Sequence, residues 1–174
     1  MDLSDVARIF EQSTESAFRL ETLPQYLVPQ EEDALAAWRA GDRQLDTPAD
    51  SPWLARVKAT TDQGYRWSRV HVLDYPLSEY SEFELFGYQA NQAAGEEVFV
   101  ADRSSSPELE DLREDFWVVD DVTVIRMVYD AEGRFVRPEL PDDTTPYLEM
   151  RSIALRHSDP LSDFLARREP RLIA

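Results

Sequence analysis

The stretch DFWVVDDVTVIRMVYDAEGRFVRPE, residues 115–139, constrains the fold more than any other part of the chain. It opens with an apolar run at 116–119, which ends at two adjacent carboxylates, Asp120 and Asp121, of the kind that form turns. Residues 122–129 are mostly β-branched and aromatic and alternate along the chain, which favours a pleated strand over a helix. These features predict two antiparallel strands joined by a tight turn.

A third strand completes the stretch. Gly133, which can adopt positive φ, marks a second turn, and residues 134–139 return along the strand before them. Pro138 marks the end of this strand or an edge position, because proline cannot donate to a sheet ladder. We therefore predict a three-stranded meander at the centre of a sheet, with a buried core of Phe116 or Trp117, Val118, Val124, Val128 and Phe135.

The rest of the chain predicts helices and a few strands around this meander. Apolar residues at helical spacing, with caps and breakers at the ends, predict helices at 3–13, 30–40, 51–64, 78–93 and 144–157 and a last one after Asp159-Pro160. Strands are expected at 65–74 and 98–101, an extended segment or edge strand at 17–28, and a mobile acidic loop at 102–114. We predict an α+β fold in a single domain, 1–174, with one mainly antiparallel sheet and helices packed on it.

Charge narrows the range of partners. The chain has 18 basic and 35 acidic residues, a net charge of −17, and no cysteine. Such a surface repels phosphate backbones and anionic membranes, so we expect no direct nucleic-acid or membrane partner. Without an apolar run of about 18 residues or a signal-like start, a cytoplasmic location is expected. A basic protein partner fits the charge, and so does a merely solubilising acidic surface.

Residues that carry catalysis are sparse in this sequence. Only His71 and His157 could act as imidazole bases, and their strand and helix-end positions predict structural roles. The motifs that cradle phosphate or build a nucleophile elbow are absent. Adjacent carboxylates are explained by turns, and nothing in their spacing selects Glu84, Glu96 or Glu97. The sequence therefore assigns no catalytic, cofactor-binding or metal-binding residue and predicts no cofactor, with Asp120, Asp121 and Asp142 as the candidates if the protein is an enzyme.

Several segments together resemble a known family. They are AFRLETLPQY, VLDYPLSEYSEFEL followed by AAGEEV, DFWVVDDVTVIRMVYDAEGRF and HSDPLSDFL, and they cover nearly the whole chain. The chain resembles an actinobacterial family of uncharacterised single-domain proteins, often encoded beside Scr1-type helix-turn-helix regulators. The resemblance implies a cytoplasmic setting near transcriptional control and carries no catalytic residues.

The expected order of elements also resembles half of a phospholipase D-type domain. Those enzymes need the pattern H-x-K-x-x-x-x-D, whereas Leu73 and Asp159 stand two residues after the histidines here. The resemblance implies a related fold without that active site.

Two functions follow as hypotheses. The first is a non-enzymatic accessory or regulatory protein that binds a basic protein partner, such as a helix-turn-helix regulator, through the acidic segment 102–114. The alternative is a carboxylate- or metal-dependent enzyme acting on a small molecule. An enzyme predicts an enclosed pocket with converging carboxylates, and a binding module predicts an exposed aromatic or acidic patch.

Overall fold

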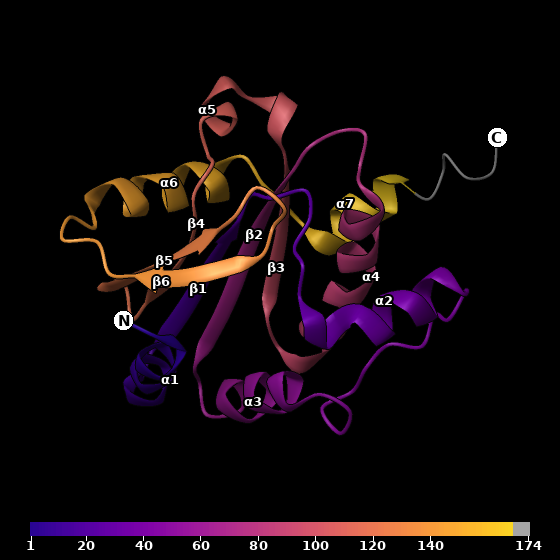
Figure 1. Ribbon diagram of the computed structural model, residues 1–174, viewed down its shortest axis with the longest axis horizontal. Coiled ribbons are helices and arrows are strands. Elements are labelled where there is room, and N and C mark those ends of the chain that lie inside the picture. The colour runs from indigo at the N-terminus through magenta and orange to yellow at the C-terminus, as the bar shows by residue number, and fades with distance from the viewer. Residues whose placement is uncertain (169–174) are drawn as a thin grey trace.

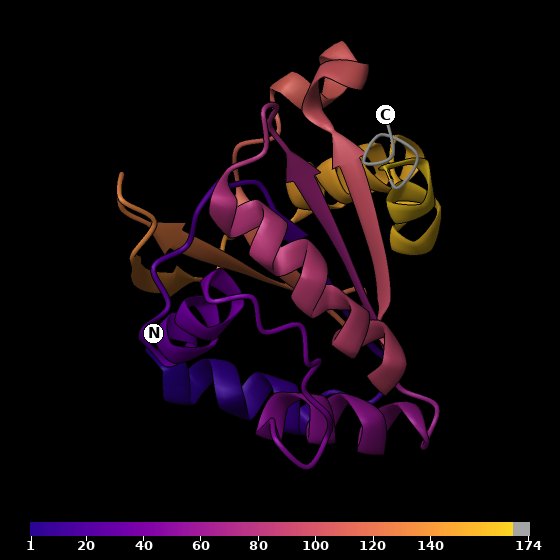
Figure 2. The ribbon, with the colours of Figure 1, turned by 90° about the vertical axis from the view of Figure 1, so that its right-hand side faces the viewer.

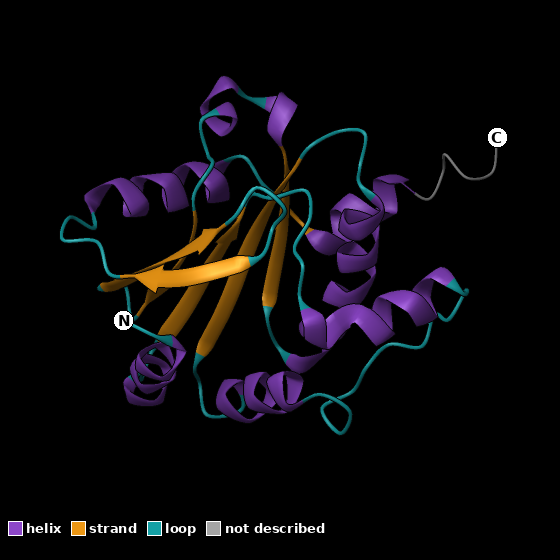
Figure 3. Cartoon of the chain, in the orientation of Figure 1, coloured by secondary structure: helices purple, strands orange, loops and turns teal. Residues whose placement is uncertain are grey.

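A single mixed sheet organises the computed structural model, which describes residues 1–168. Within these residues seven strands lie in the order β6-β5-β4-β1-β2-β3-β7 (Figures 1 and 3). The strands are β1 (Ser16–Glu21), β2 (Arg66–Leu73), β3 (Glu97–Asp102), β4 (Asp115–Val119), β5 (Thr123–Tyr129), β6 (Phe135–Glu139) and β7 (Asp159–Pro160).

The predicted α+β class with a mainly antiparallel sheet is confirmed. Strands β1, β2 and β3 run parallel to their neighbours in that group, and the other neighbouring strands pair antiparallel. The meander forms as β4, β5 and β6, but it lies at one side of the sheet and not at its centre. Phe116, Val118 and Val124 are buried as predicted, while Val128 and Phe135 are only half-buried because they lie toward the β6 edge.

The centre of the sheet is β1, which corrects the prediction of an extended segment or edge strand at 17–28. Phe18 and Leu20 alternate with Arg19 and Glu21, and this alternation is typical of a strand with one solvated face. In the structure both faces of β1 are covered, and Arg19 and Glu21 are buried like the apolar residues Phe18 and Leu20. Neighbouring strands and covering helices, which local sequence does not specify, account for the difference.

Helices cover both faces of the sheet. Tyr147 and Ile153 of α6 pack on the face that carries Phe18, and Leu54 of α3 and Ala90 of α4 pack on the face that carries Ala17. Helix α4 crosses over β2 and β3 (Figure 2). The helices are α1 (Leu3–Gln12), η1 (Pro29–Glu31), α2 (Glu32–Arg39), α3 (Pro52–Thr61), α4 (Glu79–Ala94), η2 (Arg103–Ser105), α5 (Pro107–Glu110), α6 (Thr145–Arg156) and α7 (Leu161–Arg168).

The acidic segment expected to be a mobile loop at 102–114 is instead folded. It contains η2 and α5, and Leu109 and Leu112 are buried in the core. The Arg103 guanidinium is buried beneath it, donating to the carbonyl oxygens of Leu109, Leu112 and Thr22. The many polar residues of the 102–114 segment favour a loop, but two leucines and one buried arginine attach the segment to the sheet.

Candidate functional site

A cavity of about 670 Å³ lies between the sheet, α2, α4 and the 42–52 connection. Aromatic side chains form much of its wall, including Tyr26, Trp38, Trp53, Tyr80 and Phe83. Its size and apolar wall are those of pockets that bind small organic molecules. The lining carries several carboxylates but only one cationic side chain, Arg69.

The floor of the cavity is polar because of strand periodicity. Successive side chains of a strand point to opposite faces, so Arg19 and Glu21 of β1 share the α4 side with Arg69 and His71 of β2. All four side chains are buried. A set of polar and charged side chains thus lies where a helix-covered sheet normally places apolar residues.

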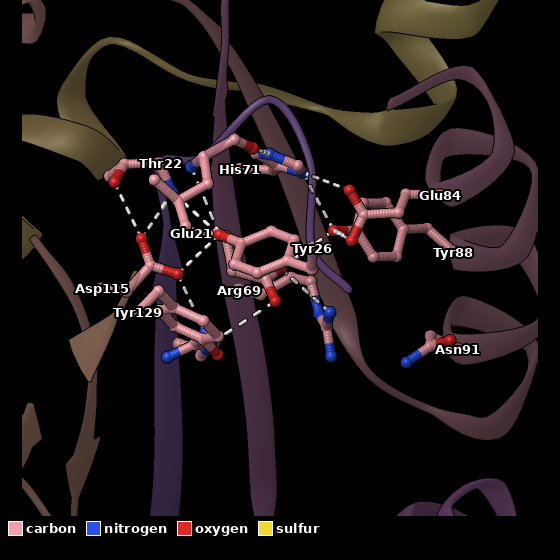
Figure 4. Close-up of polar contacts among 12 residues, drawn as sticks. Glu21, Thr22, Tyr26, Arg69, His71, Glu84, Tyr88, Asn91, Asp115 and Tyr129 are labelled. Carbon is pink, nitrogen blue, oxygen red and sulfur yellow. Dashed lines mark hydrogen bonds and ion pairs between the residues drawn. The ribbon is translucent and has the colours of Figure 1, made fainter. Parts of the chain in front are cut away.

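Helix α4 supplies the facing side chains. Glu84, Gly87, Tyr88 and Asn91 are three and four residues apart, so they lie on one helical face, and all of them line the cavity. Figure 4 shows Glu84 and Tyr88 pointing from α4 toward Glu21 and His71. Gly87 suggests close packing or a weak point in the helix, but a Cβ at this position would meet nothing within 4 Å.

Tyr26 is brought over the floor by the segment that follows β1. Gly133, in the turn between β5 and β6, has φ +84°, and a Cβ there would lie 2.3 Å from the Gln25 carbonyl oxygen. The Gly133 carbonyl oxygen also accepts a 2.9 Å hydrogen bond from Leu27 N. Only glycine permits this approach, so the meander turn helps to hold Tyr26 in place.

Asp115, at the start of β4, joins the polar residues of the floor to the meander in one hydrogen-bond network. Its carboxylate accepts from the Arg19 guanidinium at 2.9 Å, from the Tyr26 hydroxyl at 2.5 Å and from the Thr22 hydroxyl at 2.7 Å. Burial raises the pKa of Asp115, against the opposing effect of Arg19. With these donors the carboxylate is fully satisfied and joins β1 to β4.

Glu21 lies at the middle of the floor. It accepts from Arg69 Nη1 at 3.0 Å and from the Tyr88 hydroxyl at 2.9 Å, and Arg69 continues to Glu96 at 2.6 Å. Burial disfavours the charge on Glu21, but Arg69 and Arg19 outweigh burial and lower its pKa to about 2. Glu21 is therefore ionised at neutral pH.

The tautomer of His71 follows from its partners. His71 Nε2 lies 3.1 Å from the Leu23 carbonyl oxygen, which can only accept, so Nε2 carries a proton. Burial lowers the pKa of His71, which keeps the ring neutral and leaves a lone pair on Nδ1. Nδ1 lies 3.0 Å from the Tyr88 hydroxyl and 3.5 Å from Glu84 Oε2.

Among the described residues, the Glu84 carboxyl makes no ion pair with an arginine or lysine side chain. Its Oε1 lies 3.3 Å from the Tyr88 hydroxyl, and its buried Oε2 makes no hydrogen bond within the described residues. Burial raises the pKa of Glu84 well above its ordinary value, and the nearby Glu21 and Glu31 act in the same direction. A buried carboxyl oxygen without a hydrogen bond costs stability, so its presence calls for a reason other than folding.

The structure places the sequence candidates elsewhere. Asp120 and Asp121 form the β4–β5 turn, both with positive φ, and the turn closes with a bond from Val122 N to Val119 O. Asp120 accepts at 2.9 Å from the main-chain N–H groups of three residues, Thr14, Glu15 and Ser16. The predicted turn role is confirmed for this pair, whereas Asp142 lies exposed after β6 and does not line the cavity.

The histidines differ in setting. His157 caps the end of α6 at the surface and lies 2.7 Å from a Glu108 oxygen, as a helix-end structural role predicts. His71 is fully buried and belongs to the cavity floor. The sequence names Glu84 without a reason to select it, and the available signal is its three- and four-residue spacing to Gly87 and Tyr88 on one helical face.

The fold and the floor define an α+β protein with a carboxylate-rich cavity at the face of a mixed sheet. The chain belongs to the family described as Domain of unknown function (DUF6879), which matches residues 4–166. No curated protein and no solved structure matches the chain significantly, so the resemblance to half of a phospholipase D-type domain stays a prediction. Among residues 1–168, no helix is both long and apolar enough to cross a membrane.

Proposed function

We propose that this protein binds a small organic molecule, uncharged or cationic, in the cavity between α2, α4 and the sheet. The observation that carries the proposal is Glu84, a buried carboxyl at the floor of an aromatic-walled cavity, with one oxygen that makes no hydrogen bond. Aromatic walls favour a flat or apolar body, and the floor favours a group that donates hydrogen bonds or carries positive charge.

Charge disfavours anionic ligands. The lining includes the carboxylates of Glu21, Glu31 and Glu84 near the floor and the exposed Asp42, Asp46 and Asp50 in the connection after α2. Arg69 is the one cationic side chain of the lining, and it is already bonded to Glu21 and Glu96. An anion would enter a region whose charges oppose it.

A ligand screen with a blocking variant tests the proposal. We expect members of a panel of uncharged and cationic aromatic compounds to change the fluorescence of Trp38 and Trp53, which line the cavity, and to raise the melting temperature. The Gly87→Leu variant adds a side chain to the cavity face of α4 and should weaken this binding at least tenfold. Leucine also favours helix by roughly 0.5–1 kcal/mol over glycine, so the variant should remain folded.

The matched control is Ala93→Leu, which adds the same side chain to an exposed position of α4 outside the cavity. It should bind the same compounds as the unmodified protein. If no compound in the panel binds saturably, the proposed function is wrong. Equal binding by the Gly87→Leu variant would place the compounds at another site and would also contradict the proposal.

A second candidate function is binding to a basic protein partner, such as a helix-turn-helix regulator, by a non-enzymatic cytoplasmic protein of actinobacterial origin. Its support is the net charge of −17, the family resemblance and the exposed acids Glu108, Glu110 and Asp111 of the folded 102–114 segment. Opposite charge accelerates association and is screened by salt. Glu108 already pairs with Arg156 and His157 within the chain, so the double variant Glu110→Gln/Asp111→Asn tests this candidate function more sharply than a Glu108 variant. The measurement is the salt dependence of binding to the partner on a biosensor.

A further inference from the structure

We propose that Glu21, His71 and Glu84 form a binding site for one divalent transition-metal ion, of the Mn²⁺ or Zn²⁺ kind, at the floor of the cavity. One oxygen from each carboxylate and one imidazole nitrogen all lie within 4.8 Å of one another. Two atoms that are each about 2.1 Å from one ion lie at most about 4.2 Å apart. The widest spacing therefore needs to close by at most about 0.6 Å when an ion binds.

The orientation of His71 is that of a metal ligand. Histidines that bind metals almost always donate their other ring N–H to a carboxylate, a carbonyl oxygen or water, which fixes the ring and directs the free lone pair. His71 Nε2 does this toward the Leu23 carbonyl oxygen at 3.1 Å. Its Nδ1 is consequently the nitrogen that faces Glu84 and Tyr88.

The hydrogen bonds at the floor leave several acceptors without a donor. The Tyr88 hydroxyl oxygen lies within 3.3 Å of His71 Nδ1, Glu21 Oε2 and Glu84 Oε1, and its single proton can serve only one of these three acceptors. Glu84 Oε2 has no hydrogen-bond donor. A cation between these atoms would satisfy the remaining acceptors together, as a neutral side chain could not.

The balance of buried charge points the same way. Arg19 and Arg69 are the cations of the floor network, and the ion pairs they make are with Glu21, Glu96 and Asp115. Glu84 remains as an additional carboxyl. Glu21 keeps capacity for an ion despite its bonds to Arg69 and Tyr88, because an ionised carboxylate has about four lone-pair positions.

The donor set selects the kind of ion. Carboxylate oxygen suits Mg²⁺ and Ca²⁺ as well as Mn²⁺, whereas imidazole nitrogen suits Zn²⁺, Fe²⁺ and Ni²⁺, so the histidine in this set favours transition metals over Mg²⁺ and Ca²⁺. Glu21 and Glu84 line the cavity whereas His71 is fully buried behind them. Coordination positions not filled by protein would thus face the cavity. The inference rests on the proposed function in one respect, because the small molecule bound in the cavity would then lie against the ion.

The test uses the full chain after treatment with a chelator, titrated calorimetrically with Mn²⁺, Zn²⁺, Mg²⁺ and Ca²⁺. A surface of net charge −17 attracts cations diffusely, so about 0.15 M salt is needed to screen it. We expect one saturable site for Mn²⁺ or Zn²⁺ and much weaker binding of Mg²⁺ and Ca²⁺. Glu84→Gln should weaken this binding by more than about 100-fold, since loss of an outer partner alone costs about 10–100-fold.

The two histidines allow the site to be located by NMR. Added Zn²⁺ should shift the imidazole signals of His71 at one equivalent and leave those of His157 unchanged. Asp120→Asn, which removes a carboxylate charge from the β4–β5 turn, is the control and should keep the affinity. Absence of one-equivalent binding, unchanged affinity in Glu84→Gln, or shifts at His157 instead of His71 would each overturn the metal site.

The outcomes separate this inference from the proposed function. Cavity compounds that bind the chelated protein and are blocked by Gly87→Leu would leave the proposed function standing even if no metal binds. Conversely, one-equivalent metal binding with no compound in the cavity would support the metal site and contradict the proposed function.

Discussion

The β4–β5 turn and the cavity floor each contain a carboxyl group held by the tertiary structure, and the two groups differ in their effect on the stability of the fold. Asp120 in the turn accepts three main-chain N–H groups at the start of β1. Glu84 at the floor has an oxygen that makes no hydrogen bond within the described part of the chain. The turn carboxylate stabilises the native structure, whereas the floor carboxyl costs stability, a cost that the proposed binding would account for.

The largest effect should come from removing the cation that neutralises the floor. Arg69→Met leaves Glu21 and Glu96 buried with fewer charged partners, because Arg69 bonds to both. Breaking one side of a buried ion pair costs about 3–5 kcal/mol. Urea unfolding measures this loss, and Arg137→Met is the matched control, since Arg137 is exposed on the β6 edge and should change stability by less than about 0.5 kcal/mol.

If Arg69→Met were no more harmful than Arg137→Met, the floor would be solvated in solution. The ion pairs of the floor would then contribute no more to stability than an exposed pair does.

An intermediate effect is expected from the turn. Asp120→Ala removes the acceptor for three N–H groups, and loss of comparable side-chain caps on helices costs about 0.5–2 kcal/mol. Asp121→Ala is the control, because both residues have positive φ, at 52° and 57°, and alanine pays the same conformational cost at either position. Asp121 contacts the Arg151 side chain at the surface, so its loss should cost less by thermal or urea unfolding.

The pH dependence gives a second check on the turn. Burial acts against the charge of Asp120, but the N–H donors of Ser16, Thr14 and Glu15 outweigh it and lower its pKa in the folded protein. A lowered pKa contributes stability above the unfolded value of about 3.9, which is lost as pH falls through the folded pKa. The stability difference between the protein and Asp120→Asn should therefore be largest near neutral pH and shrink below about pH 4. A difference that grew on acidification would contradict the assignment.

The smallest effect should be at Glu84 itself. Glu84→Gln replaces a carboxyl whose Oε2 makes no hydrogen bond within the described residues, so stability should stay within about 0.5 kcal/mol or rise. Glu96→Gln is the matched control, because Glu96 is a buried carboxylate of the same network that accepts from Arg69 and Asn91 at 2.6 Å each. This variant should lose about 1–3 kcal/mol in urea unfolding. Similar losses in the two variants would show that Glu84 has a structural partner in solution.

Local patterns determined much of the architecture. The alternation at 122–129 and the paired aspartates produced the meander, and apolar spacing with caps produced helices close to their observed bounds, as for α3 and α4. Residues that decide such elements lie within a few positions of one another, so the physical causes are contained in short segments of the sequence. The burial of Phe116, Val118 and Val124 follows from the same alternation.

Only the tertiary structure decided the sheet order and the site. The alternation at Phe18–Glu21 is the same for an edge strand and for a strand buried on both faces, and parallel pairing with β2 settles the matter. The floor joins residues far apart in the chain, since Glu21 and Tyr88 are 67 positions apart and His71 and Leu23 are 48. The sequence shows that Glu84 is present, but whether its carboxyl has a hydrogen-bond or ion-pair partner depends on which side chains the folded sheet brings beside it.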